Sequence, residues 1–201
     1  MSIGNMVIVS GCEKDENGGL KIPTEKYSFS EGVFNPGSDG SYTISLAVNI
    51  NNCNTTSFLI ASGKNSSARD YGDLFCLYFY NKQLSVAVNL GDSRSDSTTL
   101  YDFFLTNGPE NIVIDLVYTI YHVYVYKNGK LFKDYSVDGK VATPTNRLGL
   151  CCLTNEGGMQ EYRYGSEITY YAFNLYDRAL TPEEIEHNFN TYNNRYNLNL
   201  K

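Results

Sequence analysis

The sequence predicts an all-β sandwich of two antiparallel sheets, a jelly roll, closed by one short C-terminal helix. Three observations predict it. The 201 residues include 18 Tyr and 10 Phe, which favour strands. Turn signals separate many short strand-like runs, and only the last segment has a convincing helical pattern. This pattern suits a jelly roll of about a dozen strands, in one domain over residues 1–201. The turn signals are Asn35-Pro36-Gly37, Asn81-Lys82, Asn107-Gly108-Pro109, Asn128-Gly129, Asp138-Gly139 and Glu156-Gly157-Gly158.

Residues 1–34 are less regular than the rest. A short apolar run, Met6–Ser10, precedes a polar, glycine-rich stretch, Cys12–Gly19. We expect an N-terminal strand that pairs with one of the sheets. The alternative is a docking arm that contacts a partner chain.

A β-hairpin is expected around Asn128-Gly129, because both residues tolerate the positive φ of a type I′ turn. On the strand before it, Val123 and Val125 share one face. The other face carries His122, Tyr124 and Tyr126. This aromatic face either packs under a neighbouring element or forms part of a concave surface.

The last strand is expected from the alternation of two sets of residues in a run rich in aromatic and β-branched side chains. Ile168, Tyr170, Ala172 and Asn174 would share one face, and Thr169, Tyr171, Phe173 and Leu175 the other. A charged corner, residues 176–180, ends the strand.

A helix is expected over residues 181–196. Thr181 is a suitable N-cap, Pro182 suits the first helical position, and Glu184 is placed to complete a capping box. Ile185, Phe189 and Tyr192 recur on one face, which indicates that the helix lies on the sheet.

Four stretches in order resemble the concanavalin A-like, laminin-G-like jelly-roll modules. Tyr176–Ile185 (YDRALTPEEI) resembles their closing strand and corner, and Ser41–Val48 their first long strand, with Ala47 where Trp is common. Tyr124–Leu131 resembles their central hairpin, and Asn146–Leu150 the strand before their final loop. The resemblance spans roughly Tyr42 to Phe189 and implies the same jelly roll. This superfold carries binding, catalytic and structural modules.

The tail after the Glu-Glu-Ile turn, HNFNTYNNRYNL, resembles the close of such modules in bacteriophage virion proteins. This resemblance implies a virion protein that adheres to host surface glycans, or one that contacts other virion proteins or copies of itself. A bacterial cell-surface or secreted protein is the alternative location.

Charge excludes one class of partner. A net charge of −6 with scattered cations argues against nucleic-acid binding. No apolar run is long enough for a membrane span, and we expect no signal peptide.

The five cysteines are an odd number without metal-ligand spacing, at positions 12, 53, 76, 151 and 152. We expect small buried thiols kept reduced; a disulfide or a ligand cluster is the alternative. Cys151 and Cys152 would continue the strand from Leu148 and point to opposite faces.

No catalytic pattern is visible, and we expect no enzyme. Glucanases of the resembled fold carry Glu-x-Asp-x-x-Glu on a strand, which is absent here, and Glu161 and Glu167 have the wrong spacing. Glu183, Glu184 and Glu186 suit a helix start. His122 and His187 have no Ser or Cys motif beside them. A glycosidase with an unfamiliar carboxylate pair is the least favoured alternative.

Carbohydrate binding is the function that we expect, because a Tyr ring offers an apolar face to a sugar and its hydroxyl can bond to the rim. Three loops could supply the surface: residues 64–73, 91–102 and 155–164. Their candidate ligand-binding residues are Arg69, Asp70, Tyr71, Tyr101, Gln160, Glu161, Tyr162 and Tyr164. For any single Tyr, packing on a sheet is the competing interpretation.

Calcium is a possible cofactor, since the resembled modules often hold it through rim-loop oxygens. Candidate ligands are Asp70, Asp73, Asp92 and Asp96. Solvated loop carboxylates are the alternative.

A structural virion component without a sugar site is the strongest rival function.

Overall fold

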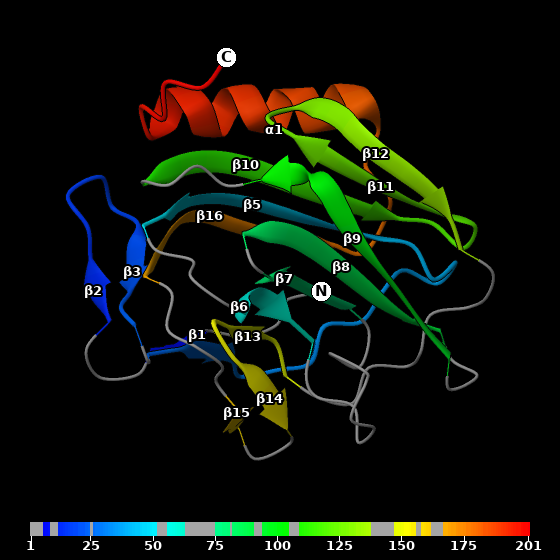
Figure 1. Cartoon of the computed structure of the whole chain (residues 1–201), viewed down its shortest axis with the longest axis horizontal. Coiled ribbons are helices and arrows are strands. Elements are labelled where there is room, and N and C mark those ends of the chain that lie inside the picture. Colours follow the sequence, from blue (N-terminus) through cyan, green and yellow to red (C-terminus); the bar gives the residue numbers. More distant parts are fainter. Residues whose placement is uncertain are drawn as a thin grey trace.

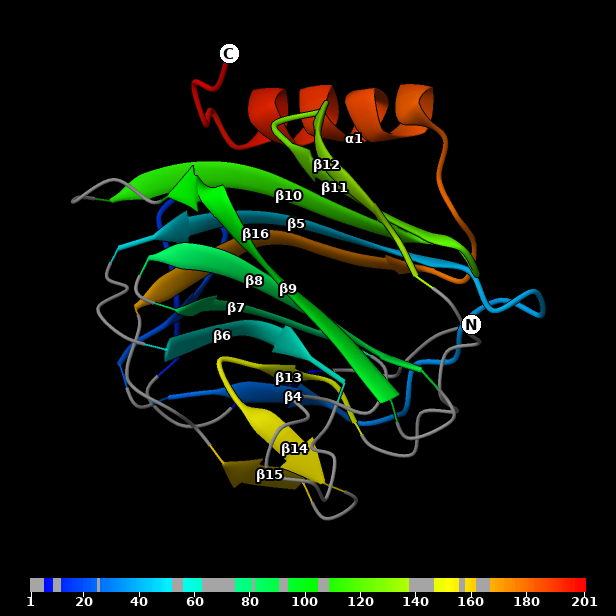
Figure 2. The ribbon, with the colours of Figure 1, turned by 45° about the vertical axis from the view of Figure 1, so that its right-hand side comes forward.

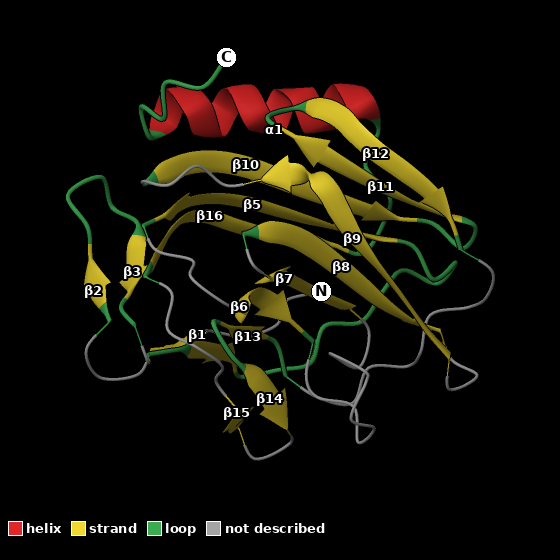
Figure 3. Ribbon diagram, in the orientation of Figure 1, coloured by secondary structure: helices red, strands yellow, loops and turns green. Residues whose placement is uncertain are grey.

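Two antiparallel sheets face each other, and a single helix lies on the outer face of one of them (Figure 1). The computed structural model describes residues 6–8, 12–24, 26–51, 56–62, 75–80, 82–90, 94–104, 109–137, 147–155, 158–161 and 167–201. The jelly-roll sandwich predicted from the sequence is confirmed (Figure 3).

The first sheet has the strand order β1-β4-β13-β6-β7-β8-β9. Its strands are β1 (Met6–Ile8), β4 (Ser28–Ser30), β6 (Thr56–Ala61), β7 (Phe75–Tyr80), β8 (Gln83–Leu90), β9 (Arg94–Phe104) and β13 (Gly149–Leu150).

The second sheet has the order β12-β11-β10-β5-β16-β3-β2. Its strands are β2 (Glu13–Lys14), β3 (Leu20–Ile22), β5 (Tyr42–Ile50), β10 (Glu110–Tyr118), β11 (His122–Lys127), β12 (Lys130–Ser136) and β16 (Ile168–Tyr176). A separate hairpin joins β14 (Leu153–Asn155) to β15 (Gly158–Glu161), and the helix is α1 (Pro182–Arg195).

The N-terminal residues contribute strands to both sheets. β1 pairs with β4, aligning Met6 with Ser30, and β3 pairs with β16, aligning Ile22 with Ile168. The described part of residues 1–34 therefore pairs with this chain's own sheets.

The main core lies between the sheets and consists almost entirely of Ile, Leu, Val, Phe and Tyr side chains. The Tyr42 ring stacks on Tyr118 at 5.1 Å between centroids. Tyr170 crosses the core, and its hydroxyl donates a hydrogen bond of 2.6 Å to the Leu59 carbonyl of the opposite sheet. This bond satisfies a polar group that would be costly to bury alone.

A β-bulge interrupts β16. Tyr170 aligns with Val48 and Ala172 with Ala47, so Tyr171 is an extra residue. Tyr170 points into the main core before the bulge, and Phe173 packs against the same core after it. The predicted two-face alternation therefore holds only as far as Tyr170, because one inserted residue exchanges the faces.

The predicted Asn128-Gly129 turn is confirmed, with φ of 51° and 76°. The turn lies under the helix: a Cβ atom on Gly129 would be 2.9 Å from Cδ1 of Phe189. Glycine is thus required for both the backbone conformation and the close approach of α1.

The aromatic face of β11 packs under a neighbouring element, one of the two possibilities left open by the sequence. Tyr124 and Tyr126 contact Leu180 and Ile185, at the start of α1. Ala47 is buried in the neighbouring cluster beneath the same helix, beside Tyr192.

The cysteine geometry differs from the prediction. β13 ends at Leu150, and Cys151 has φ of 58°, so the two cysteines do not continue a regular strand. Cys76, Cys151 and Cys152 are buried free thiols, as expected, whereas Cys12 is only half-buried. Cys53 lies outside the described residues.

Candidate functional site

Most of the predicted ligand-binding residues fall outside the described part of the chain. These are Arg69, Asp70, Tyr71, Tyr162 and Tyr164, and the candidate calcium ligands Asp73 and Asp92 do so too. Their role stays a prediction.

Two of the predicted loops are wrong in part. Residues 94–104 form strand β9, which places Tyr101 and Asp96 on the edge strand of the first sheet. Its polar run pairs with β8 from Leu90 to Gln83, and backbone pairing of this length gives a strand without an apolar face of its own. Gln160 and Glu161 lie on β15, in the β14–β15 hairpin.

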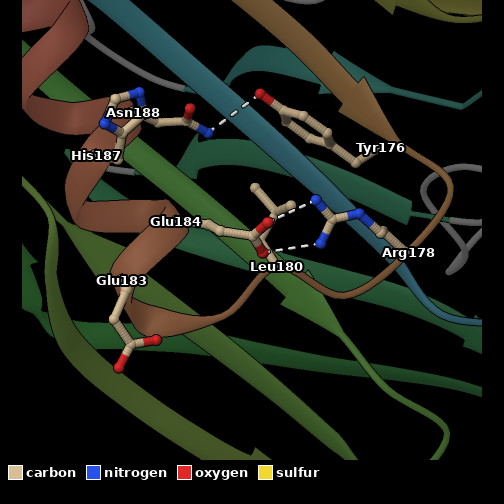
Figure 4. A pocket seen from close by; sticks show the side chains of 7 residues that line it. All are labelled: Tyr176, Arg178, Leu180, Glu183, Glu184, His187 and Asn188. Atoms are coloured by element: carbon tan, nitrogen blue, oxygen red, sulfur yellow. Dashed lines mark hydrogen bonds and ion pairs between the residues drawn. The ribbon is translucent and has the colours of Figure 1, made fainter.

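An open pocket of about 280 Å³ lies where β16 turns into α1 (Figure 4). Its lining consists of Tyr176, Arg178, Leu180, Glu183, Glu184, His187 and Asn188. All seven come from the last residue of β16, the corner and the first two turns of α1. Small-molecule sites usually measure about 300 Å³ or more, so this pocket is close to the lower end of that range.

The corner is fixed by Thr43 of β5. Its hydroxyl donates to the Arg178 carbonyl at 2.9 Å and accepts from the Leu180 amide at 3.0 Å. Both bonds bridge more than 130 residues of sequence, and they set the point at which the helix begins.

The charged groups of the pocket hold the start of the helix. The Arg178 guanidinium donates two hydrogen bonds to the Glu184 carboxylate, of 2.8 and 2.7 Å. The same carboxylate also accepts a hydrogen bond from the Thr181 amide at 2.9 Å. Thr181 in turn caps the Glu184 amide at 3.3 Å, so the predicted capping box is confirmed. The Arg178 hydrogen bonds lower the pKa of Glu184 from 4.5 to about 2.

These contacts make Glu184 unsuitable as a general acid. A glycosidase needs one carboxyl group that is protonated near neutral pH, whereas Glu184 remains ionised down to about pH 2. The pKa of Glu183 is also lowered, by hydrogen bonds from its own backbone amide and from Thr181, and its side chain points away from the Arg178 pair (Figure 4). Asn188 donates to the Tyr176 hydroxyl at 3.1 Å.

A second polar group, missed in the sequence, is buried beneath α1. Asp115 of β10 is 0% exposed, and Ser45 donates a hydrogen bond to its Oδ1. Its Oδ2 has no hydrogen-bond partner among the described residues. The sequence signal was an acid, Asp115, in the middle of the apolar run IVIDLVY of this strand.

Neither a metal-binding cluster nor a membrane-spanning helix is found in the part of the chain that the structure describes. No group of three or more His, Cys, Asp or Glu side chains there is arranged to hold a metal ion. None of the helices described is sufficiently long and apolar to cross a membrane.

Comparison with solved structures finds toxin binding domains. The receptor-binding domain of botulinum neurotoxin D matches with a TM-score of 0.68 and 13% identity, over 93% of this chain and 47% of that one. The serotype D ligand-binding domain in complex with N-acetylneuraminic acid matches with a TM-score of 0.68 and 13% identity, over 93% and 46%. The binding domain of Paraclostridial Mosquitocidal Protein 1 gives a TM-score of 0.69 and 13% identity, over 95% and 48%.

The likeness is one of fold. The chain spans about half the length of the binding domains that it matches, and at these identities their ligands are not carried over. No family model and no curated protein matches the sequence.

Proposed function

We propose that this chain is a non-catalytic module that binds carbohydrate and serves in adhesion. The observation that carries the proposal is the fold shared with toxin receptor-binding domains, one of them crystallised with N-acetylneuraminic acid. The corner pocket supports it indirectly, because its acidic groups are engaged in capping a helix and lack the acid and base pair of a glycosidase.

One described part of the proposed sugar surface, the β14–β15 hairpin, lies away from the helix. The β14–β15 hairpin, which carries Gln160 and Glu161, is on the opposite side of the sandwich from α1 (Figures 1 and 2). Arg69, Asp70, Tyr71, Tyr162 and Tyr164 stay part of the proposal on sequence grounds. Tyr101 lies on β9, at the edge of the first sheet away from β13 and the hairpin, and would bind separately. Calcium held by Asp70 and Asp73 is part of the same proposal.

For the biological setting we propose a bacteriophage particle that recognises host surface glycans. The support is the resemblance of the C-terminal segment to virion modules. A bacterial surface or secreted protein is the alternative setting.

A structural virion component is the second candidate function. It is favoured by two large apolar side chains near the β12 edge of the second sheet, Tyr121 at 64% and Leu131 at 53% exposure. Exposed apolar side chains at a sheet edge suit contact with another subunit.

A glycan array tests the proposal. It should carry sialylated glycans and bacterial surface polysaccharides and be probed with and without calcium. We expect specific binding that falls at least tenfold in Tyr71→Ala or Tyr162→Ala, whereas Tyr121→Ala, the removal of an exposed Tyr elsewhere, leaves it unchanged.

Three other results would be informative. Loss of binding in His187→Ala alone would move the site to the corner pocket, and loss on chelation would establish a calcium site. A blank array with working positive controls would reject sugar binding in favour of the structural role, and Tyr121→Ala and Leu131→Ala would then be tested for loss of subunit contacts.

A further inference from the structure

Asp115 lies on the face of the second sheet that α1 covers. Its neighbours at alternate positions of β10, Val113 and Val117, belong to the two clusters beneath the helix. Ile114 and Leu116 point the other way, into the main core. Figures 1 and 2 both show α1 running across β10. A carboxyl group at this position is cut off from water only while the helix is docked.

A chain of hydrogen bonds connects the helix to this carboxyl group. Asn174 of β16 donates to the Tyr192 hydroxyl at 2.5 Å, and Tyr192 of α1 is also hydrogen-bonded to Ser45. Ser45 donates to Asp115 Oδ1. Ser45 has one proton, and the structure directs it to Asp115 Oδ1. The other oxygen of the carboxyl group, Oδ2, has no hydrogen-bond partner among the described residues.

An anion would be costly here. A buried carboxylate needs a cation or several donors, and Asp115 has one hydroxyl. Burial is the larger influence on its pKa and raises it from 3.8 to about 7, against the smaller opposite effect of the Ser45 bond. No Lys, Arg or His among the described residues contributes to that pKa.

Three other titratable groups near Asp115 keep their charge between pH 5 and 8. From β11, Tyr126 faces it directly; the pKa of this phenol is raised, first by burial and then by Tyr124, Asp115 and Glu183. From α1, burial raises the pKa of Tyr192 to about 12. Glu183, also on α1, has a lowered pKa and is ionised throughout this range. Of these four groups, Asp115 is the one whose pKa lies near neutrality.

α1 is attached in a way that allows it to separate from the sheet. Among the described residues, its backbone–backbone hydrogen bonds stay within residues 181–198, and contacts to the sheet are made by side chains. β10, in contrast, is paired on both sides, along all nine of its residues with β5. Exposing Asp115 by lifting the helix breaks no strand pairing.

We propose that Asp115 is a proton-controlled latch for α1: the neutral carboxyl group lets the helix dock, and loss of its proton favours a state in which the helix has lifted from the sheet. The sign follows from linkage. Because the pKa is higher in the docked state than in the open state, docking is most favourable below about pH 4 and weakens progressively up to about pH 7.

Hydrogen exchange of the α1 amides, corrected for the intrinsic rate, tests the latch between pH 5 and 8.5. In the unmodified chain we expect protection to fall about tenfold per pH unit up to pH 7 and then to level off. Asp115→Asn, which cannot ionise, should give pH-independent protection. Asp134→Asn removes an exposed acid from β12 and should keep the original slope.

Two outcomes would overturn the latch. One is pH-independent protection in the unmodified chain. The other is equal protection of the amides of α1, β5 and β10, which would mean that the helix opens only when the whole sandwich unfolds.

A direct titration covers the case in which Asp115→Asn fails to fold. The Asp115 carboxyl carbon, followed by NMR in the unmodified chain, should titrate near neutrality, and Ser45→Ala should move the midpoint upward because the anion loses its donor. A midpoint near pH 4 would reject the proposal.

Discussion

The two faces of the second sheet are built from different chemistry, although the same strands supply both. Towards the main core, β5 and β10 present Ile44, Leu46, Val48, Ile112, Ile114 and Leu116. Towards α1 they present Thr43, Ser45, Ala47, Val113, Asp115 and Val117. The first interface is stabilised mainly by apolar area, whereas the second combines small apolar contacts with hydrogen bonds that fix where the helix begins and how it lies. We infer that the sandwich and its helix differ in stability and in their response to pH.

The largest expected effect is on the core face. Leu46→Ala removes a fully buried side chain and should lower the free energy of unfolding by about 2–5 kcal/mol. Urea denaturation followed by circular dichroism measures it. Strand and helix signals should be lost in one transition, because α1 has no platform without the sheet. A helix that persists after the sheet unfolds would contradict this dependence.

A smaller effect is expected on the helix face. Gly129→Ala places a Cβ atom at a position with positive φ, where that atom also collides with the Phe189 ring. The substitution should therefore destabilise the docked helix by about 2 kcal/mol. Gly18→Ala is the matched control, since Gly18 also has positive φ but a Cβ there would only reach ordinary contact with Lys14. It should cost about 1 kcal/mol. Equal losses in the two variants would show that Phe189 adjusts without cost.

The helix cap contributes less again. Thr181→Ala removes the side-chain acceptor of the capping box and should cost about 1 kcal/mol, detected as faster hydrogen exchange in the first turn of α1. Thr181→Ser keeps the acceptor and should retain most of the protection. A loss of the same size in both variants would trace the effect to the Thr methyl group.

The smallest effect is electrostatic and has the opposite pH dependence to Asp115. The folded-state pKa of Glu184 lies below its ordinary value. The ionised carboxylate therefore stabilises the docked helix above about pH 4.5, and this stabilisation is lost as the pH falls through about 2. Loss of this contribution should lower the helix circular dichroism in acid, and Glu184→Gln should abolish that decrease. The contact is exposed, so its loss should be slight, and an acid-induced change that survives in Glu184→Gln would assign it to other carboxyl groups.

Features set by neighbouring residues were predictable from the sequence. The capping box at Thr181, the turn at Asn128-Gly129 and the apolar face of α1 each depend on a few adjacent side chains, and each is confirmed. The resemblance to jelly-roll modules gave the correct sandwich. These signals are local, so no knowledge of the partner strand is needed to read them.

Features set by distant strands were not predictable. The bulge at Tyr171 depends on register with β5, and the strand that contains Tyr101 exists because β8 pairs with it. The burial of Asp115 depends on a helix about 70 residues later in the chain, which no pattern around an isolated acid reveals. Of the candidate sugar site, the sequence indicated residues in three segments, 64–73, 91–102 and 155–164, and their joint geometry stays a prediction.

The contact between Gly129 and Phe189 also bears on evolution. A relative that gains a side chain at position 129 must shrink the residue at 189 or move its helix, so substitutions at these two positions should be correlated across homologues. In sequences too divergent for overall alignment, a glycine after the hairpin Asn paired with an aromatic residue in the second turn of the following helix would identify chains that carry the same helix on the same face.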